Sequence, residues 1–166
     1  IWRFGAFRFF VDFQLWLPIW VIYLNETRGL SLTEITFLDV PFWLLLIVLE
    51  IPTGIVADRW GRKVSLCYGA FINAVAVLVF GLAGNIAILF VSYSVWAVAW
   101  TLFSGADSAF VYDSLKAAGR REEYQKIWGR IHSISLVAGV VSLVLGAFLA
   151  AITNLWFPIV VSAGLM

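Results

Sequence analysis

Long apolar stretches separated by short polar turns make up almost the whole chain. A membrane-spanning helix needs about 20 mainly apolar residues, and the pattern predicts five full spans and the start of a sixth. We expect these spans at residues 4–24, 32–57, 64–83, 86–115 and 124–152, followed by a truncated span at 155–166. Because the connections are short, neighbouring helices should be antiparallel. The predicted fold class is an all-α, polytopic transmembrane helix bundle.

Local signals refine the first two helices. Ser31 and Glu34 stand in the S-x-x-E pattern of a capping box, which satisfies the free amides at a helix start. Pro18 and Pro41 lie inside the first and second spans, where proline either kinks a membrane helix or is simply tolerated. The sequence starts at Ile1 and stops inside an apolar stretch, so we expect a fragment at both ends.

The composition excludes an ordinary soluble domain. Of the 166 residues, 63% are hydrophobic and only 13% are charged, whereas a soluble domain carries about a quarter of charged residues. The excess of apolar side chains must therefore face lipid. Aromatic residues make up 17% of the chain and include nine Trp, which fits aromatic belts at the membrane interfaces. The single cysteine, Cys67, cannot form a disulfide within this sequence or a cysteine-based metal site.

The basic residues lie almost entirely on one side of the predicted bundle. Ten of them fall near the chain start, in the turn after the second helix, or around the turn after the fourth: Arg3, Arg8, Arg59, Arg62, Lys63, Lys116, Arg120, Arg121, Lys126 and Arg130. Only Arg28 falls on the other side. Since Lys and Arg mark cytoplasmic loops, we expect a multi-pass protein of the cell (cytoplasmic or inner) membrane with its amino terminus in the cytoplasm.

The turn after the second helix carries an unusual density of charge. The segment EIPTGIVADRWGRK, residues 50–63, contains the pattern G-x-x-x-D-R-x-G-R-K, whose members are Gly54, Asp58, Arg59, Gly61, Arg62 and Lys63. Glu50, Gly54 and Asp58 are four residues apart, so they share one helix face. Gly54 would let another helix approach closely, and Gly61 would permit a tight reversal.

This pattern resembles the loop between helices 2 and 3 of the major facilitator superfamily and matches it at every defining position. The resemblance covers the whole chain, as the amino-terminal six-helix half with its last helix truncated. It implies a secondary transporter that moves solutes by alternating access around a midplane cavity. The carboxy-terminal six-helix half would then be a partner that this sequence lacks.

The resemblance also implies roles in a cytoplasmic gate. In the family, the Asp of the pattern is held against a helix of the second half, and the later Arg pairs with an acid at the end of helix 4. The corresponding residues here are Asp58, Arg62 and Asp113. A positive-inside anchor is the simpler alternative, but it explains only the bases. It does not explain Gly54, Asp58 and Gly61 at these spacings, so we favour a gate.

Three acids are expected in the inner half of the membrane: Asp12, Glu50 and Asp107. Ionisable groups at this depth are costly and are functional candidates by default. In one interpretation, Asp12 and Asp107 line the cavity, and one of them takes up a proton or a cationic solute. In the other, the acids pair with Arg8, Arg130 and His132 in a closing salt-bridge network. We expect Glu50 to lie at the interface between the two halves.

The fourth helix carries an aromatic stripe at steps of three and four residues: Tyr93, Trp96, Trp100, Phe103 and Asp107. Aromatic faces together with a carboxylate suit an organic cation or an amphipathic solute, although a stripe packed on lipid or on other helices is the more common case. The Arg that many proton-driven exporters of the family carry in mid-helix 4 is replaced here by Thr101. This departure leaves uniport, symport and unusual coupling open.

The sequence therefore predicts a secondary active transporter for a small organic solute, with proton coupling and export of a cationic or amphipathic compound as specific options. The alternative is a membrane scaffold or receptor that keeps the fold without transporting. An enzyme is not expected, because one His and one Cys cannot build a metal or nucleophile cluster at membrane depth. We expect no cofactor and no metal. We also expect no nucleic-acid partner, since topology accounts for the bases.

Overall fold

The computed structural model describes residues 2–166, and their regular structure is entirely helical. The chain forms α1 (Trp2–Asp12), α2 (Trp20–Ile22), the π-helical turn η1 (Tyr23–Thr27), α3 (Leu32–Trp60), α4 (Arg62–Leu82), α5 (Ile86–Ser104), α6 (Asp107–Ala117), the 3₁₀ turn η2 (Arg121–Glu123), α7 (Tyr124–Ile152) and α8 (Phe157–Leu165). Within residues 2–166, four helices are long and apolar enough to cross a membrane, counting α5 and α6 together.

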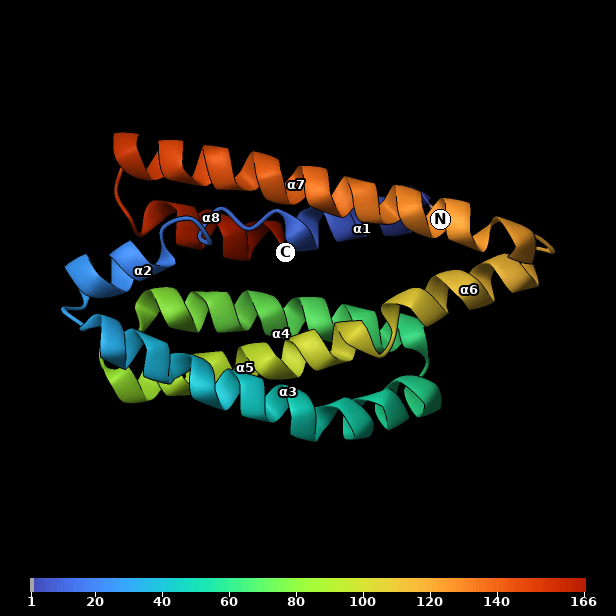
Figure 1. The fold of residues 1–166 in the computed structure, drawn as a ribbon, viewed down its shortest axis with the longest axis horizontal. Helices are drawn as coiled ribbons and strands as arrows, with labels where there is room; N and C mark the ends of the chain where they lie inside the picture. The colour runs from blue at the N-terminus through green and yellow to red at the C-terminus, as the bar shows by residue number, and fades with distance from the viewer. Residues whose placement is uncertain (1) are drawn as a thin grey trace.

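The helices lie side by side along the long axis of the molecule in two groups (Figure 1). The first group comprises α3, α4 and α5, in which α5 packs against both other helices. The second group comprises α1, α7 and α8, and α8 joins the groups by packing on α4. Short polar side chains fasten the first group: Ser65 donates to the carbonyl of Leu102 at 3.0 Å, and Ser92 to that of Ala76 at 2.8 Å. Such side chains are typical of contacts between membrane helices.

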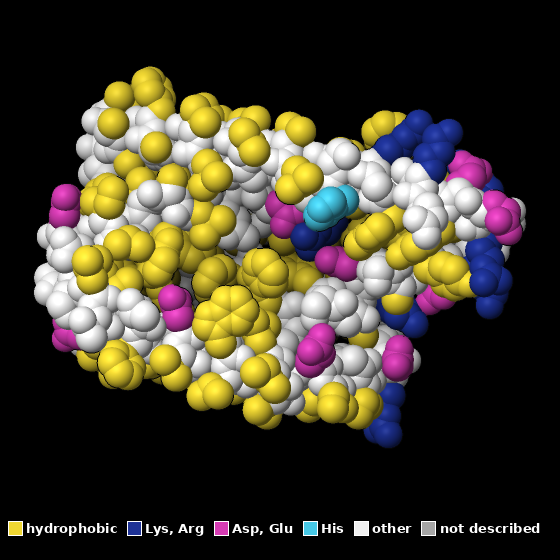
Figure 2. All heavy atoms as spheres, viewed as in Figure 1, with side chains coloured by type: hydrophobic (Ala, Val, Ile, Leu, Met, Phe, Trp, Pro, Cys, Tyr) yellow, Lys and Arg dark blue, Asp and Glu magenta, His cyan; other side chains and the backbone are white. Residues whose placement is uncertain are grey.

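Large apolar faces remain uncovered on α3 and α7. Trp43, Ile47 and Ile51 of α3 are 62%, 75% and 76% exposed, and Val140, Val144 and Phe148 of α7 are also exposed. Figure 2 shows hydrophobic side chains spread along the visible face of the molecule, while Lys and Arg gather mainly at one end. We call this end the basic end. A soluble monomer rarely exposes such faces, so they are suited to lipid or to further helices.

The expected helix over residues 4–24 is wrong as a single element. The structure ends α1 at Asp12, and the chain runs through turns before α2 begins at Trp20. Pro18 provides one reason, because it has no amide hydrogen for a helical bond and restricts the residue before it. The amide side chain of Gln14 donates to the carbonyl of Val11 at 3.1 Å, which satisfies one backbone group at the break.

The non-helical segment after α1 is buried against α7 rather than exposed. A Cβ atom at Gly146 would collide with the carbonyl of Leu15, lying 2.8 Å from its carbon. Non-helical backbone at membrane depth is tolerated where protein buries it. Gly146 therefore allows α7 to cover the non-helical segment after α1.

The expected helix over residues 86–115 also has an interruption. The structure ends α5 at Ser104 and begins α6 at Asp107, with Gly105 and Ala106 between them. At this point a Cβ on Gly105 would lie 3.5 Å from the Cα of Gly54. The interruption thus coincides with a close approach of two backbones, which the pattern of apolar residues does not reveal.

Gly146→Ala should destabilise the protein, because its methyl group would strike the Leu15 backbone. We expect a loss of roughly 1–3 kcal/mol, the range for overpacking, despite the better helix propensity of alanine. Thermal unfolding of the purified full-length protein in detergent measures the effect. Gly139→Ala is the matched control on the same helix, since a Cβ there meets nothing within 4 Å. Equal melting temperatures for the two variants would contradict this packing.

Candidate functional site

Arg8 joins two carboxylates inside the helix bundle. Its Nη2 lies 2.8 Å from Asp12 Oδ1, one turn further along α1, and its Nη1 lies 3.0 Å from Asp107 Oδ2 at the start of α6. The side chains of Arg8, Asp12 and Asp107 are only 18%, 22% and 15% exposed. Hydrogen bonds between charged groups are shorter and stronger than neutral ones. We call these three residues the charge triad.

The local sequence explains how the triad is placed. Arg8 and Asp12 are four residues apart on α1, so their side chains meet on one face. Asp107 lies in the first turn of α6, where the helix dipole favours a negative charge. The Arg8 guanidinium also lies 5.7 Å from the ring centre of Phe103. That ring is fixed by α4, because a Cβ at Gly69 would be only 2.9 Å from it.

The triad lines a small pocket of about 90 Å³. Its other lining residues are Val11, Gln14, Asn73, Trp100, Phe103 and Ser104. Among residues 2–166, three buried acceptor oxygens on this lining have no hydrogen-bond partner: Asp12 Oδ2, Asp107 Oδ1 and Asn73 Oδ1. Buried acceptors are normally paired. The pocket is therefore suited to a donor or a positive charge.

This pocket divides the apolar interior into two clusters. Towards the basic end, α1, α4 and α5 contribute residues such as Phe4, Leu66 and Phe103 to one cluster. Towards the other end, Trp16 and Phe80 belong to a second cluster. The pocket-lining residues Asp12, Asn73 and Trp100 fall between these clusters along their own segments of chain. A polar layer with apolar packing on both sides is the result.

The sequence analysis offered two interpretations of Asp12 and Asp107, as cavity-lining residues or as members of a salt-bridge network, and the structure contains elements of both. Asp12 and Asp107 line a pocket and also pair with Arg8. The expected extension of this network to Arg130 and His132 is wrong: both side chains are exposed, and no ion pair links either to these acids within residues 2–166. Arg130 instead lines a separate pocket between α1 and α7 with Trp2 and Gly5, and His132 is exposed to the surroundings.

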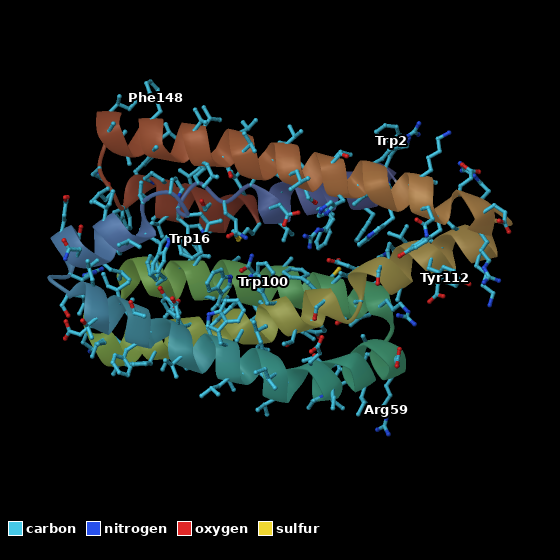
Figure 3. All side chains as sticks on the ribbon, in the orientation of Figure 1. Trp2, Trp16, Arg59, Trp100, Tyr112 and Phe148 are labelled. Atoms are coloured by element: carbon cyan, nitrogen blue, oxygen red, sulfur yellow. The ribbon has the colours of Figure 1, made fainter. Side chains whose placement is uncertain are left out.

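The aromatic stripe does not act as one surface. Tyr93 and Phe103 are buried, and Trp96 packs at ring-centre distances of 4.6 Å from Phe42 and 5.2 Å from Trp16. Three members of the stripe line the pocket, Trp100, Phe103 and Asp107, while Tyr93 and Trp96 do not. In Figure 3, Trp16 lies between the two helix groups, while Trp100 lies over α4 and α5 of the first group. Trp96 therefore belongs to the apolar cluster and supports Trp100, with which it makes an edge contact at 6.3 Å.

A second charged site lies at the turn between α3 and α4. Arg62 Nε is 2.8 Å from Asp113 Oδ2 on α6, and Arg62 Nη2 is 3.6 Å from Asp58 Oδ1 on α3. Gly61, with φ at 93°, forms the single-residue reversal between the two helices. Arg62 thus ties α3 and α6 to the start of α4. We call this group, Asp58, Arg62 and Asp113, the charge clamp.

The other residues of the charged turn make no such contacts within residues 2–166. Arg59, Lys63 and Glu50 are exposed and form no ion pair there, and Arg59 points away from the bundle (Figure 3). The close approach expected at Gly54 involves its backbone, which faces Gly105. The position that a side chain of residue 54 would occupy is empty, because a Cβ on Gly54 would meet nothing within 4 Å. The face that carries Glu50, Gly54 and Asp58 is therefore open.

Four pocket residues escaped the sequence analysis, Val11, Gln14, Asn73 and Ser104, of which Asn73 and Gln14 carry buried amides. Asn73 is buried in α4, and its amide nitrogen contacts the sulfur of Met166 at 3.1 Å. Gln14 is buried at the break after α1. A signal for Asn73 existed, since it is a lone amide in the middle of the apolar segment that follows Tyr68. Gln14 could not be interpreted without the break itself.

Comparison with known proteins gives one distant similarity to report. Over 89 residues, the chain is 27% identical to a Bacillus subtilis (strain 168) protein named "uncharacterized MFS-type transporter YxaM". The matched segment covers 54% of this chain and 22% of that protein, so the chain corresponds to only a part of this relative. No family model matches the chain.

Replacing Arg8 should reveal how much the interaction between Arg8 and Asp107 contributes to the stability of the protein. Arg8→Gln leaves two partly buried carboxylates unpaired, and we expect a stability loss of about 3 kcal/mol, the low end for breaking a buried ion pair. Adding Asp107→Asn should restore at least half of that loss, because it removes one of the two like charges. Thermal unfolding of the two single variants and the double variant forms the required cycle. Strictly additive effects would show that Arg8 and Asp107 do not interact.

Proposed function

We propose that this chain is the amino-terminal half of a secondary active transporter that moves a small organic solute by alternating access. The observation that carries the proposal is the charge triad in its pocket between the two apolar clusters. Ionisable side chains at membrane depth that face a cavity typically belong to solute or ion pathways. The distant similarity to a protein named as a transporter supports the same class.

The charge balance of the triad favours coupling to a proton. Two carboxylates face one guanidinium, which leaves one net negative charge when both acids are ionised. One proton or one monovalent cation neutralises it. Protonation of Asp107 would also weaken its contact with Arg8 and free the guanidinium to pair with Asp12 alone. Symport and antiport are both compatible with this exchange.

The pocket favours a cationic or amphipathic solute. Trp100 lines it on one side, and three acceptor oxygens on its surface lack partners within residues 2–166. Aromatic faces and carboxylates together attract organic cations. The volume of about 90 Å³ fits only a small group. We therefore propose that the second half completes a larger cavity, of which this pocket receives the positively charged end.

The charge clamp is proposed as the cytoplasmic gate. The contacts of Arg62 with Asp113 and Asp58 hold α6 and α3 against the start of α4 at the basic end. Glu50, Gly54 and Asp58 lie on an open face. A helix of the second half would dock its positive amino end near Asp58 when the gate is closed. Cytoplasmic loops carry an excess of Lys and Arg. We therefore propose that the basic end and the amino terminus lie on the cytoplasmic side of the cell membrane.

The central test is solute flux in proteoliposomes that contain the full-length protein, driven by a pH gradient. A screen of organic cations and amphipathic solutes first identifies a transported compound. We expect Asp107→Asn to decouple flux from the pH gradient while solute binding survives, because the site can no longer exchange a proton. The exposed acid Glu122 provides the control, and Glu122→Gln should transport like the parent.

Two results would contradict the proposal. If Asp107→Asn transports with the same gradient dependence as the parent, the triad holds helices together without coupling. If no member of a broad solute panel is transported while the reconstituted protein stays folded, the scaffold or receptor alternative is favoured.

A further inference from the structure

A second pocket, of about 350 Å³, lies at the basic end, away from the charge triad. Side chains of α1, α4 and α6 line it, and the triad contributes none of them. Its wall on α1 is formed by Phe4 and Phe7, and its wall on α6 by Phe110 and Val111. We call this pocket the α1–α4–α6 groove.

The groove has an apolar interior and a basic rim. The ring centres of Phe4 and Phe7 lie 5.9 Å apart in a stacked arrangement, and those of Phe4 and Phe110 lie 5.2 Å apart. Aromatic rings therefore cover much of the interior. Arg3 and Lys63, both exposed, also line the groove. No Asp or Glu is among its lining residues within residues 2–166. Within residues 2–166, neither Arg3 nor Lys63 forms an ion pair, and Lys63 also lines a neighbouring pocket with Asp58 and Asp113. Two such cations beside apolar walls are complementary to an anionic group attached to a hydrocarbon chain.

The groove continues into a surface suited to lipid. Cys67 lines it and is exposed. Phe71 and Leu78 follow four and eleven residues later on the same face of α4, and they are 67% and 39% exposed. On α1, Phe10 stands three residues beyond Phe7 and is 46% exposed. An acyl chain that leaves the groove would therefore run along an apolar surface.

We propose that the α1–α4–α6 groove binds an anionic phospholipid, with its phosphate between Arg3 and Lys63 and an acyl chain against the aromatic interior. Anionic lipids are attracted to bases next to membrane spans, and basic pockets between spans bind their head groups. Free phosphate would meet the two cations but leave the apolar walls uncovered. The proposal requires only that the chain spans a membrane, so it stands or fails independently of transport.

The chain provides its own probe of occupancy, because the thiol of Cys67 lines the groove. The full-length protein is reconstituted into vesicles of phosphatidylcholine alone or of phosphatidylcholine with phosphatidylglycerol. Alkylation of Cys67 by N-ethylmaleimide is then followed by mass spectrometry of the peptide that contains it. We expect alkylation to be at least about fivefold slower with phosphatidylglycerol, because the attraction of an anionic lipid to one or two bases should give at least this degree of occupancy.

Variants separate a specific site from the general negative potential of the vesicle. Arg3→Gln/Lys63→Gln should lose the protection of Cys67. The matched control Lys116→Gln/Lys126→Gln removes two exposed bases that do not line the groove, and it should keep the protection. Native mass spectrometry of the parent protein should also show retained phosphatidylglycerol, which tests the proposal even where the first double variant fails to fold.

Three outcomes would overturn the assignment. Equal alkylation rates in the two kinds of vesicle, together with no retained phosphatidylglycerol, would mean that the groove binds no anionic lipid. Equal loss of protection in both double variants would assign the effect to the surface potential. Protection of Cys67 by glycerol phosphate in phosphatidylcholine vesicles, as strong as that by the lipid, would assign the site to a free anion.

Discussion

The fold depends on keeping one guanidinium group and two carboxylates inside an apolar bundle. Unpaired, each of these charges would carry a desolvation cost of several kcal/mol. Arg8 avoids this by contacting Asp12 and Asp107 at 2.8 and 3.0 Å. Since Arg8 and Asp12 belong to α1 and Asp107 to α6, the triad also fixes α1 against α6. The pocket lies where these elements meet.

The irregular backbone around the pocket follows from the same arrangement. The chain leaves α1 directly after Asp12, and α5 gives way to α6 directly before Asp107. Both acids therefore stand at helix breaks, where the surrounding backbone is not held by a continuous ladder of helical bonds. Glycine makes each break compatible with dense packing: Gly146 admits the Leu15 carbonyl, and Gly105 lies against Gly54. The breaks place polar groups at a depth where uninterrupted helices would offer mainly apolar surface.

Much of the helical organisation could be predicted from the sequence, because apolar runs and capping signals are local. The capping box at Ser31 and Glu34 forms as expected, and α3, α4 and α7 occupy the apolar stretches. The contact between Arg62 and Asp113 followed from a resemblance to a known pattern. The break after Asp12 could be predicted only in part: Pro18 indicates a disturbed helix, but the packing that buries the break uses Gly146, more than 130 residues later in the chain. The place of Trp96 likewise depended on Phe42 and Trp16, which approach it only in the folded bundle.

Alternating access is the central claim, and it can be tested through Ser104, which lines the pocket without belonging to the charge triad. In the full-length protein, Ser104→Cys is combined with Cys67→Ser and reconstituted in sealed vesicles of known orientation. A membrane-impermeant thiol reagent is then added to one side or the other, and labelling at position 104 is measured. The account predicts labelling from both sides, in a ratio that shifts when solute or a pH gradient is applied. Labelling from one side only, under every condition, would contradict it.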